Sequence, residues 1–305
     1  MNVIDVHGLV KRYGDNTVVD QVSMTVKQGE ISGFLGPNGS GKTTTIRLMC
    51  GLLTPNAGGG TVLGMDLKRD QLKIKREVGY MTQKFSFYED MSIWENLMFV
   101  ARLYQLHPAE RAVRDTLENL GLSARQHQLA GNLSGGWKQR LALAACIMHK
   151  PKLLLLDEPT AAVDPLARRE FWGEIHALAA DGVTVLVSTH YMDEAELCNR
   201  INYISYGKLL TSGTVADVIA NANLTTFVIK GDDASQVARL LAGKPGVDQV
   251  APFGNTLHVV GRDTKALKES VNDAIAGRKL TAHVGETSLE DVFIQFVTHA
   301  ENDAA

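Results

Sequence analysis

The sequence predicts an α/β fold, and three patterns within its 305 residues lead to that prediction. An apolar segment, 31–35, runs into a glycine-rich loop and then a helical stretch, 42–52, which is a strand, loop and helix unit. Two short apolar segments, 152–156 and 183–188, flank a helical stretch, as neighbouring strands of a parallel sheet do. The chain after residue 222 has a β-α-β-β-α-β rhythm of its own, which is typical of a small ferredoxin-like α+β domain.

The other segments complete the predicted domain organisation. Strand-like stretches at 3–10 and 18–26 precede the glycine-rich loop and predict an antiparallel β subdomain. From about 84 to 150 the pattern becomes helical, which predicts a helical subdomain inserted between two parts of the sheet. We therefore expect one large domain over residues 1–221 and an accessory α+β domain over 222–305.

Composition excludes several classes of protein. With 45% hydrophobic and 21% charged residues, the chain is neither disordered nor collagenous, and its cysteines, at positions 50, 146 and 198, form no disulfide framework or metal motif. A formal net charge of -3 argues against a nucleic acid partner. The longest apolar run, 141–148, is far shorter than the roughly 18 residues of a membrane span, and Asp5 interrupts any signal peptide. These features predict a cytosolic chain.

The glycine-rich loop has the pattern G-x-x-x-x-G-K-[ST], which is typical of phosphate binding. The glycines let successive backbone N–H groups turn toward one anion, and the following helix directs its positive N-terminal dipole to the same place. Lys42 would add a charge near the β- and γ-phosphates, and the Thr43 hydroxyl would bind Mg²⁺. The predicted nucleotide-binding residues of this loop are Gly36, Pro37, Asn38, Gly39, Ser40, Gly41, Lys42, Thr43 and Thr44.

A second candidate element is the acidic pair at the end of the leucine-rich strand, Asp157 and Glu158. A carboxylate at the end of a buried strand can hold Mg²⁺, which assigns Asp157 to the metal. Glu158 is placed to polarise an attacking water as general base. An acidic pair after a strand is a weak signal alone, but it becomes strong beside a phosphate loop.

The segment Leu133-Ser134-Gly135-Gly136-Trp137-Lys138-Gln139-Arg140 resembles the signature motif of ATP-binding cassette (ABC) ATPases. The order of motifs also resembles that family, since the phosphate loop precedes Gln83, the signature, the acidic pair and His190. The resemblance covers about residues 1–215. It implies that two cassettes sandwich two ATP molecules head to tail, with Mg²⁺, and that hydrolysis lets them part.

The resemblance also assigns roles by position. Tyr13 resembles the aromatic residue that stacks on adenine, and Asp164 resembles the aspartate of the dimer-interface loop while also being a helix N-cap before a proline. Gln83 resembles the glutamine that reaches Mg²⁺ and the attacking water, and His190 the switch histidine at the γ-phosphate. Ser134, Gly135 and Gly136 would contact the ATP of the opposite subunit. Glu158, His190 and Gln83 are therefore the predicted catalytic residues.

Three further segments, 80–86, 189–196 and 288–293, resemble the ATP-binding subunits of type 2 ABC exporters, the multidrug-efflux group. This implies a subunit at the cytoplasmic face of the inner membrane that works as a homodimer or heterodimer. Its partners would be an integral membrane permease and, in some systems, a periplasmic adaptor. An importer subunit and a soluble regulatory ATPase are the alternatives, and the transported substrate is not encoded in this chain.

Overall fold

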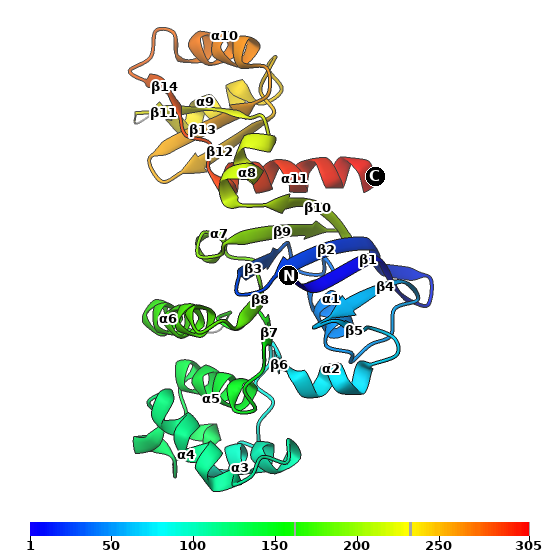
Figure 1. Ribbon diagram of the computed structural model, residues 1–305. Coiled ribbons are helices and arrows are strands. Elements are labelled where there is room, and N and C mark those ends of the chain that lie inside the picture. The colour runs from blue at the N-terminus through cyan, green and yellow to red at the C-terminus, as the bar shows by residue number, and fades with distance from the viewer. Residues whose placement is uncertain (162, 232–233, 305) are drawn as a thin grey trace. The chain divides into compact units, whose positions relative to one another are not determined.

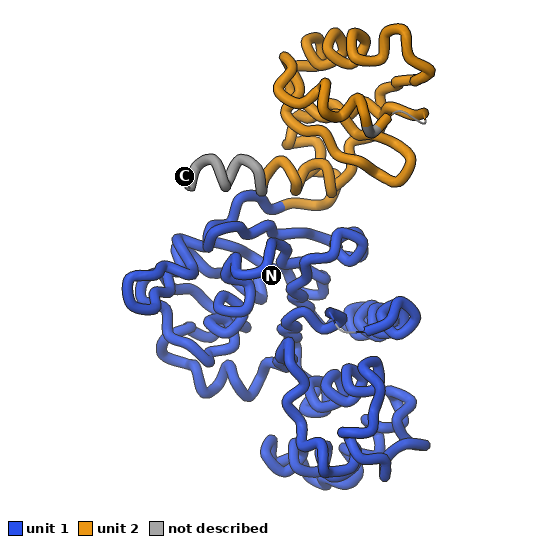
Figure 2. The backbone as a smooth tube through the Cα atoms, turned by 180° about the vertical axis from the view of Figure 1, so that it is seen from behind, with its two compact units in different colours: residues 1–212 blue, residues 213–305 orange. Residues whose placement is uncertain are grey.

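We describe the protein from a computed structural model, in which residues 1–161, 163–231 and 234–304 are described, apart from the side chains of 235 and 297–304. The chain divides into two compact units, Met1–Ser212 and Gly213–Ala305 (Figure 2). The division falls before α8 (Val215–Asn221), which contacts α11 (Leu289–Ala304), whereas the sequence analysis assigned that segment to the first domain.

The first unit is organised around a six-stranded sheet in the order β10-β9-β3-β8-β7-β6 (Figure 1). The pairings β9 with β3, β3 with β8, β8 with β7 and β7 with β6 are all parallel. β3, β7 and β8 are buried along their whole length, which explains why apolar residues follow one another in these strands instead of alternating with exposed polar ones. The strands are β3 (Ile31–Leu35), β6 (Val78–Met81), β7 (Leu153–Asp157), β8 (Thr184–Thr189), β9 (Arg200–Ser205) and β10 (Lys208–Gly213).

A smaller antiparallel sheet, in the order β2-β1-β4-β5, forms the predicted β subdomain. Its strands are β1 (Asn2–Tyr13), β2 (Asn16–Lys27), β4 (Ala57–Val62) and β5 (Met65–Asp66). The sequence analysis did not identify β4, because its Ala-Gly-Gly-Gly start has little strand propensity. Two of its glycines are needed for contact with β1, since a Cβ on Gly58 would lie 2.0 Å from the Gly8 carbonyl oxygen and a Cβ on Gly60 would lie 2.2 Å from that of Asp5.

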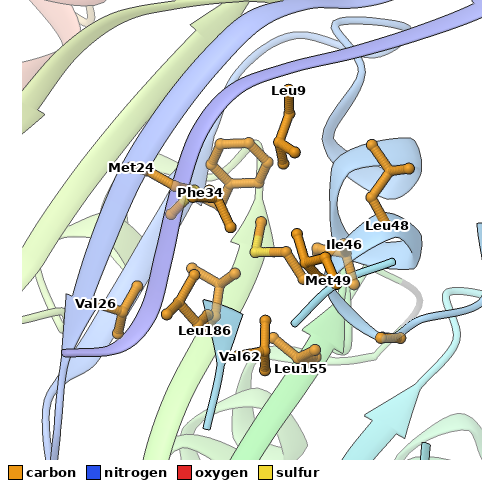
Figure 3. Close-up of a cluster of buried hydrophobic side chains, with 14 of the residues drawn as sticks. Leu9, Met24, Val26, Phe34, Ile46, Leu48, Met49, Val62, Leu155 and Leu186 are labelled. Carbon is orange, nitrogen blue, oxygen red and sulfur yellow. The ribbon is translucent and has the colours of Figure 1, made fainter. Parts of the chain in front are cut away.

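One hydrophobic cluster joins the two sheets through helix α1 (Lys42–Met49), as Figure 3 shows. Leu9 and Met24 come from the antiparallel sheet, and Phe34 and Leu186 from the parallel sheet. Met49 of α1 lies in the same cluster and is fully buried. The helix that follows the glycine-rich loop is therefore fixed by packing on both sheets.

The helical subdomain contains α3 (Ile93–Leu103), α4 (Ala109–Asn119) and α5 (Gly135–Ile147), with short 3-10 turns at Ser123–Arg125 and Ala130–Asn132. α3 begins with a capping box, in which the hydroxyl of Ser92 accepts from the backbone N–H of Glu95 and the backbone N–H of Ser92 donates to the carboxylate of Glu95. Three other helices of this unit are α2 (Gln71–Glu77), α6 (Pro165–Ala180) and α7 (Met192–Ala195).

The second unit contains a four-stranded antiparallel sheet in the order β12-β13-β11-β14. Two helices, α9 and α10, contribute to the core of this unit. This is the order expected of a ferredoxin-like β-α-β-β-α-β unit, and the prediction of that fold is confirmed. The elements are β11 (Thr225–Lys230), α9 (Ala234–Leu241), β12 (Gln249–Phe253), β13 (Thr256–Gly261), α10 (Thr264–Ile275) and β14 (Thr281–Gly285). Among the described residues, no helix combines the length and apolarity needed to span a bilayer.

Candidate functional site

Four parallel strands bring most of the predicted site residues to one edge of the sheet. The phosphate loop follows β3, Gln83 follows β6, Glu158 follows β7 and His190 follows β8. Because these four strands are parallel and adjacent in the sheet, their carboxyl ends, and the loops that leave them, meet at the same edge. Residues separated by as much as 154 positions in the chain, from Gly36 to His190, therefore share one site.

The phosphate loop surrounds a cavity of about 240 Å³. It is lined by Val18, Asn38, Gly39, Ser40, Gly41, Lys42, Thr43, Thr44, Gln83 and Glu158. The Ser40 hydroxyl is buried and has no hydrogen-bond partner among the described residues. The cavity thus has a loop of backbone N–H groups, a buried lysine and an acidic residue around one space.

Two glycines of the loop are required by close backbone approach. A Cβ on Gly36 would lie 2.1 Å from the carbonyl oxygen of Ile204, and a Cβ on Gly41 would lie 2.6 Å from that of Val18. Gly41 also has a φ of 102°, in the left-handed region that favours glycine, and it is the N-cap of α1. The loop therefore turns tightly into the helix, and the backbone at the start of α1 is left open to an anion.

Lys42 is almost fully buried, with 4% of its surface exposed. Its ammonium group donates to the carbonyl oxygens of Gly36 at 2.7 Å and Pro37 at 3.1 Å, and it lies 3.3 Å from Oε1 of Glu158. Burial lowers the pKa of Lys42, and the neighbouring carboxylate of Glu158 opposes that shift. The lysine is therefore held at the base of the loop by acceptors that an oxygen-rich anion can replace.

The other carboxylate oxygen of Glu158, Oε2, meets the remaining predicted catalytic residues. The side-chain amide of Gln83 donates to it at 2.9 Å, and Nδ1 of His190 lies 3.4 Å from it. Glu158 has a φ of 45°, which is unusual for a residue with a side chain, and its own N–H donates to Ser188. Glu158 is thus the point on which Lys42, Gln83 and His190 converge.

Asp157 fits the predicted role of a magnesium ligand. Its Oδ1 accepts hydrogen bonds from the hydroxyls of Thr43 at 3.1 Å and Ser188 at 2.8 Å, while its Oδ2 is buried and has no hydrogen-bond partner in the described part of the chain. Burial raises the pKa of Asp157, and the hydrogen bonds from Ser188 and Thr43 partly offset that shift. A hydroxyl and an unpaired carboxylate oxygen side by side are ligands that a hard divalent cation prefers.

The other predicted residues lie outside this cavity. Tyr13, at the end of β1, is 51% exposed, so its ring is accessible for the predicted stacking on adenine. Ser134 is the exposed N-cap of α5, and its hydroxyl makes no capping hydrogen bond. Gly136 packs closely on α6, since a Cβ there would lie 2.7 Å from the Cβ of Ala167. Asp164 caps α6 by accepting from two backbone N–H groups, as predicted.

Comparisons with known proteins identify the family of this chain. A model of the ABC transporter family matches residues 19–161. The Nod factor export ATP-binding protein I of Burkholderia thailandensis is 35% identical over 305 residues, which is 98% of each chain. The chain belongs to the ABC transporter family. It contains the ATPase domain of that family, or ABC cassette.

Two further matches bear on the cassette. A probable multidrug ABC transporter ATP-binding protein of Escherichia coli K12, YbhF, is 47% identical over 222 residues, covering 72% of this chain and 38% of its own length. The chain thus spans about two fifths of that relative. The solved structure of the ABC cassette cbiO1 from Clostridium perfringens aligns with a TM-score of 0.66 and 26% identity, covering 72% of this chain and 91% of that one.

The structure also shows site residues to which the sequence analysis gave no role. Ser188 contacts both acidic residues, because β7 and β8 are paired so that Asp157 lies opposite Ser188. The sequence signal for Ser188 was that it is a polar residue directly after the apolar part of β8. Val18 of β2 lines the cavity through its place in the antiparallel sheet, and no local pattern marks it.

Proposed function

We propose that this ABC cassette binds and hydrolyses ATP to power export of a substrate through a separate integral membrane permease. One observation carries the proposal of hydrolysis: Lys42, Gln83 and His190 all lie within 3.4 Å of the carboxylate of Glu158, at the edge of the phosphate-loop cavity. A phosphate-binding loop alone would support only nucleotide binding. A general base held beside it by three polar side chains also supports chemistry.

The residues of the chain divide the work between positioning and proton transfer. The backbone N–H groups of the loop and the ammonium of Lys42 bind and orient the phosphates. Glu158 accepts the proton of the attacking water, and Gln83 and His190 hold that water and the transferred phosphate group in line. Mg²⁺ held by Thr43 and Asp157, with Gln83 reaching it, would neutralise phosphate charge.

Dimer closure is the second part of the proposal. Ser134 and Gly135 lie exposed at the start of α5, so their backbone donors are open to a phosphate from outside this chain. Two copies, or this chain and a second cassette, would close head to tail, so that each signature segment contacts the ATP of the other. Loss of the γ-phosphate contacts would then let the cassettes part and drive the permease.

The export direction and location rest on the relatives. Relatives named for multidrug transport and for Nod factor export support an exporter at the cytoplasmic face of the membrane, held there by its permease and, in some systems, joined by a periplasmic adaptor. These relatives are named for different transported substrates although their cassettes are similar. This agrees with selection of the substrate by the permease. Purification from membranes in mild detergent tests this. We expect a multispanning protein to elute with the chain, and a lone cassette would favour a regulatory ATPase.

Glu158→Gln tests the general base. The substitution keeps the size and the acceptor oxygen that Gln83 contacts, but it removes the basicity, so we expect turnover to fall by about 100-fold or more while ATP binding is retained. Measured by phosphate release and by equilibrium ATP binding, the variant should trap an ATP-bound dimer. Hydrolysis at the unsubstituted rate would assign the base to another residue.

A further inference from the structure

The sequence analysis gave no role to Arg168 or to Glu194, which lies within the segment 189–196. Both residues contact the segments that carry the catalytic residues. Arg168 lies on α6, one turn after Asp164, and Glu194 lies on α7, four residues after His190. The side chain of Glu194 is 1% exposed and that of Arg168 is 22% exposed. Neither lines the phosphate-loop cavity, and each reaches the catalytic residues through another side chain, Arg168 through Tyr191 and Glu194 through Thr160.

Arg168 reaches the switch histidine through one aromatic ring. Its guanidinium carbon lies 4.2 Å from the ring centre of Tyr191, and its Nη1 lies 3.5 Å from the carboxylate of Asp193. The rings of Tyr191 and His190 are in turn 4.2 Å apart, at an interplanar angle of 35°. A cation over one face of the tyrosine holds that ring in place, and the ring then restricts the histidine beside it.

Glu194 joins the same arginine to the segment that follows the general base. Its Oε1 accepts a hydrogen bond from the hydroxyl of Thr160, two residues after Glu158. The same oxygen lies 3.5 Å from Nε of Arg168. The segment that carries Asp164 begins after Thr160 and ends before Arg168. Both of its ends are therefore fixed to one buried carboxylate.

This connection matters because the general base, Glu158, needs both an unusual backbone conformation and a fixed side-chain position. Glu158 has a positive φ of 45°, and a residue with a side chain keeps such a conformation only where its surroundings enforce it. Its Oε2 must also stay near Nδ1 of His190, at the observed 3.4 Å. Displacement of a catalytic group by about 1 Å can cost about 100-fold in rate.

We propose that Arg168 and Glu194 are positioning residues for ATP hydrolysis, which hold Glu158 and His190 in register by tying Thr160 and Tyr191 together. This inference rests on the proposed function. It predicts that loss of the Arg168 contacts lowers the rate of the chemical step and leaves ATP binding nearly intact.

The test compares two neighbouring arginines on α6. Arg168→Gln should lower kcat by about 10-fold or more, with the KM for ATP changed less than about twofold. Arg169→Gln is the matched control, because Arg169 is exposed and its side chain makes no hydrogen bond, ion pair or ring contact among the described parts of the chain. This variant should keep the unsubstituted kcat. Arg168→Lys, which keeps a cation near the ring, should restore part of the lost rate.

A second pair of variants tests the aromatic link and serves if Arg168→Gln does not fold. Tyr191→Phe keeps the ring and should hydrolyse ATP at nearly the normal rate, whereas Tyr191→Leu should resemble Arg168→Gln. Equal activity of the two Tyr191 variants, or equal activity of the two arginine variants, overturns the inference. So does a rise in KM with an unchanged kcat.

NMR of histidine-labelled protein separates this inference from the proposed function. The ring signals of His190, identified by their absence in His190→Gln, should shift in Arg168→Gln and not in Arg169→Gln. A shift in a protein that hydrolyses no ATP would support the positioning role while contradicting the proposed function. Unshifted His190 signals in Arg168→Gln would overturn the positioning role whatever the ATPase activity.

Discussion

Two helices, α1 and α5, begin at glycine-rich segments that the sequence marks for phosphate, yet the structure surrounds their first turns very differently. At α1, Lys42 is 4% exposed and Glu158 is 7% exposed, and both line a cavity. At α5, Ser134 and Gly135 are exposed, and neither lines that cavity. The contrast shows that the first segment is built into a cavity within this chain, whereas the second is exposed, as the proposed head-to-tail dimer requires.

Burial within each helix explains the difference. α1 lies between two sheets and is buried from its first turn onward, since Lys42, Thr45 and Ile46 are all buried. α5 is anchored by its second half, over 141–146, and its first turn extends beyond the packed part. Packing therefore orders the first loop before any ligand arrives, while the second has little packing of its own and, in the proposed function, is completed by a second cassette.

The largest expected effect is at the assembled half. Lys42→Ala removes the buried ammonium that lies among the loop carbonyls and Glu158, so ATP affinity should fall and hydrolysis should drop by at least about 100-fold. Fluorescent-nucleotide titration and phosphate release measure the two losses. Lys73→Ala, at an exposed surface ion pair, is the control and should change neither. An unchanged ATP affinity in Lys42→Ala would contradict the loop assignment.

Mixing two inactive variants tests whether the second half acts across a dimer. Ser134→Arg should block the outward half and Lys42→Ala the assembled half, so each variant should be inactive alone. Random mixing places one intact site in half of the dimers, so the mixture should regain about a quarter of the activity if the sites act independently. If mixed dimers form but the mixture regains no activity, hydrolysis requires two intact sites in the same dimer. Activity of Ser134→Arg alone would contradict the outward role.

The smallest expected effect concerns stability and its dependence on pH. Burial raises the pKa of Asp157, so the folded chain binds a proton at this carboxylate more tightly than the unfolded chain does. The free energy of unfolding therefore falls as the pH rises from 3.8 through the raised pKa. Asp157→Asn removes that contribution. Above this range it should raise the melting temperature of the nucleotide-free protein, by roughly 2–4 °C for each kcal/mol.

Thermal unfolding at several pH values measures this prediction. Asp181→Asn, at the exposed C-terminal cap of α6, should leave the melting temperature unchanged. A lower melting temperature in Asp157→Asn at neutral pH would mean that the carboxylate stabilises the nucleotide-free fold. The sign of the change therefore decides whether Asp157 is held for function at a cost in stability.

The fold and the site were predictable from sequence to different degrees. The phosphate loop, the acidic pair and the ferredoxin-like unit were identified because short patterns dictate them: a glycine spacing, a strand that ends in carboxylates, and a regular alternation of strands and helices. Strand β4 was not, because its glycines are chosen for close approach to β1 and have no strand propensity. Ser188 was assigned no role, because its contacts depend on strand register.

The sequence by itself determined which residues could bind a nucleotide, since backbone donors, a lysine and carboxylates act through local chemistry that spacing specifies. Only the tertiary structure decided that Gln83, Glu158 and His190 meet, because parallel strand order brings together residues far apart in the chain. It also decided that Arg168 and Thr160 share the carboxylate of Glu194. Contacts of that kind arise from the packing of α6 and α7 on the sheet, and no local pattern encodes them.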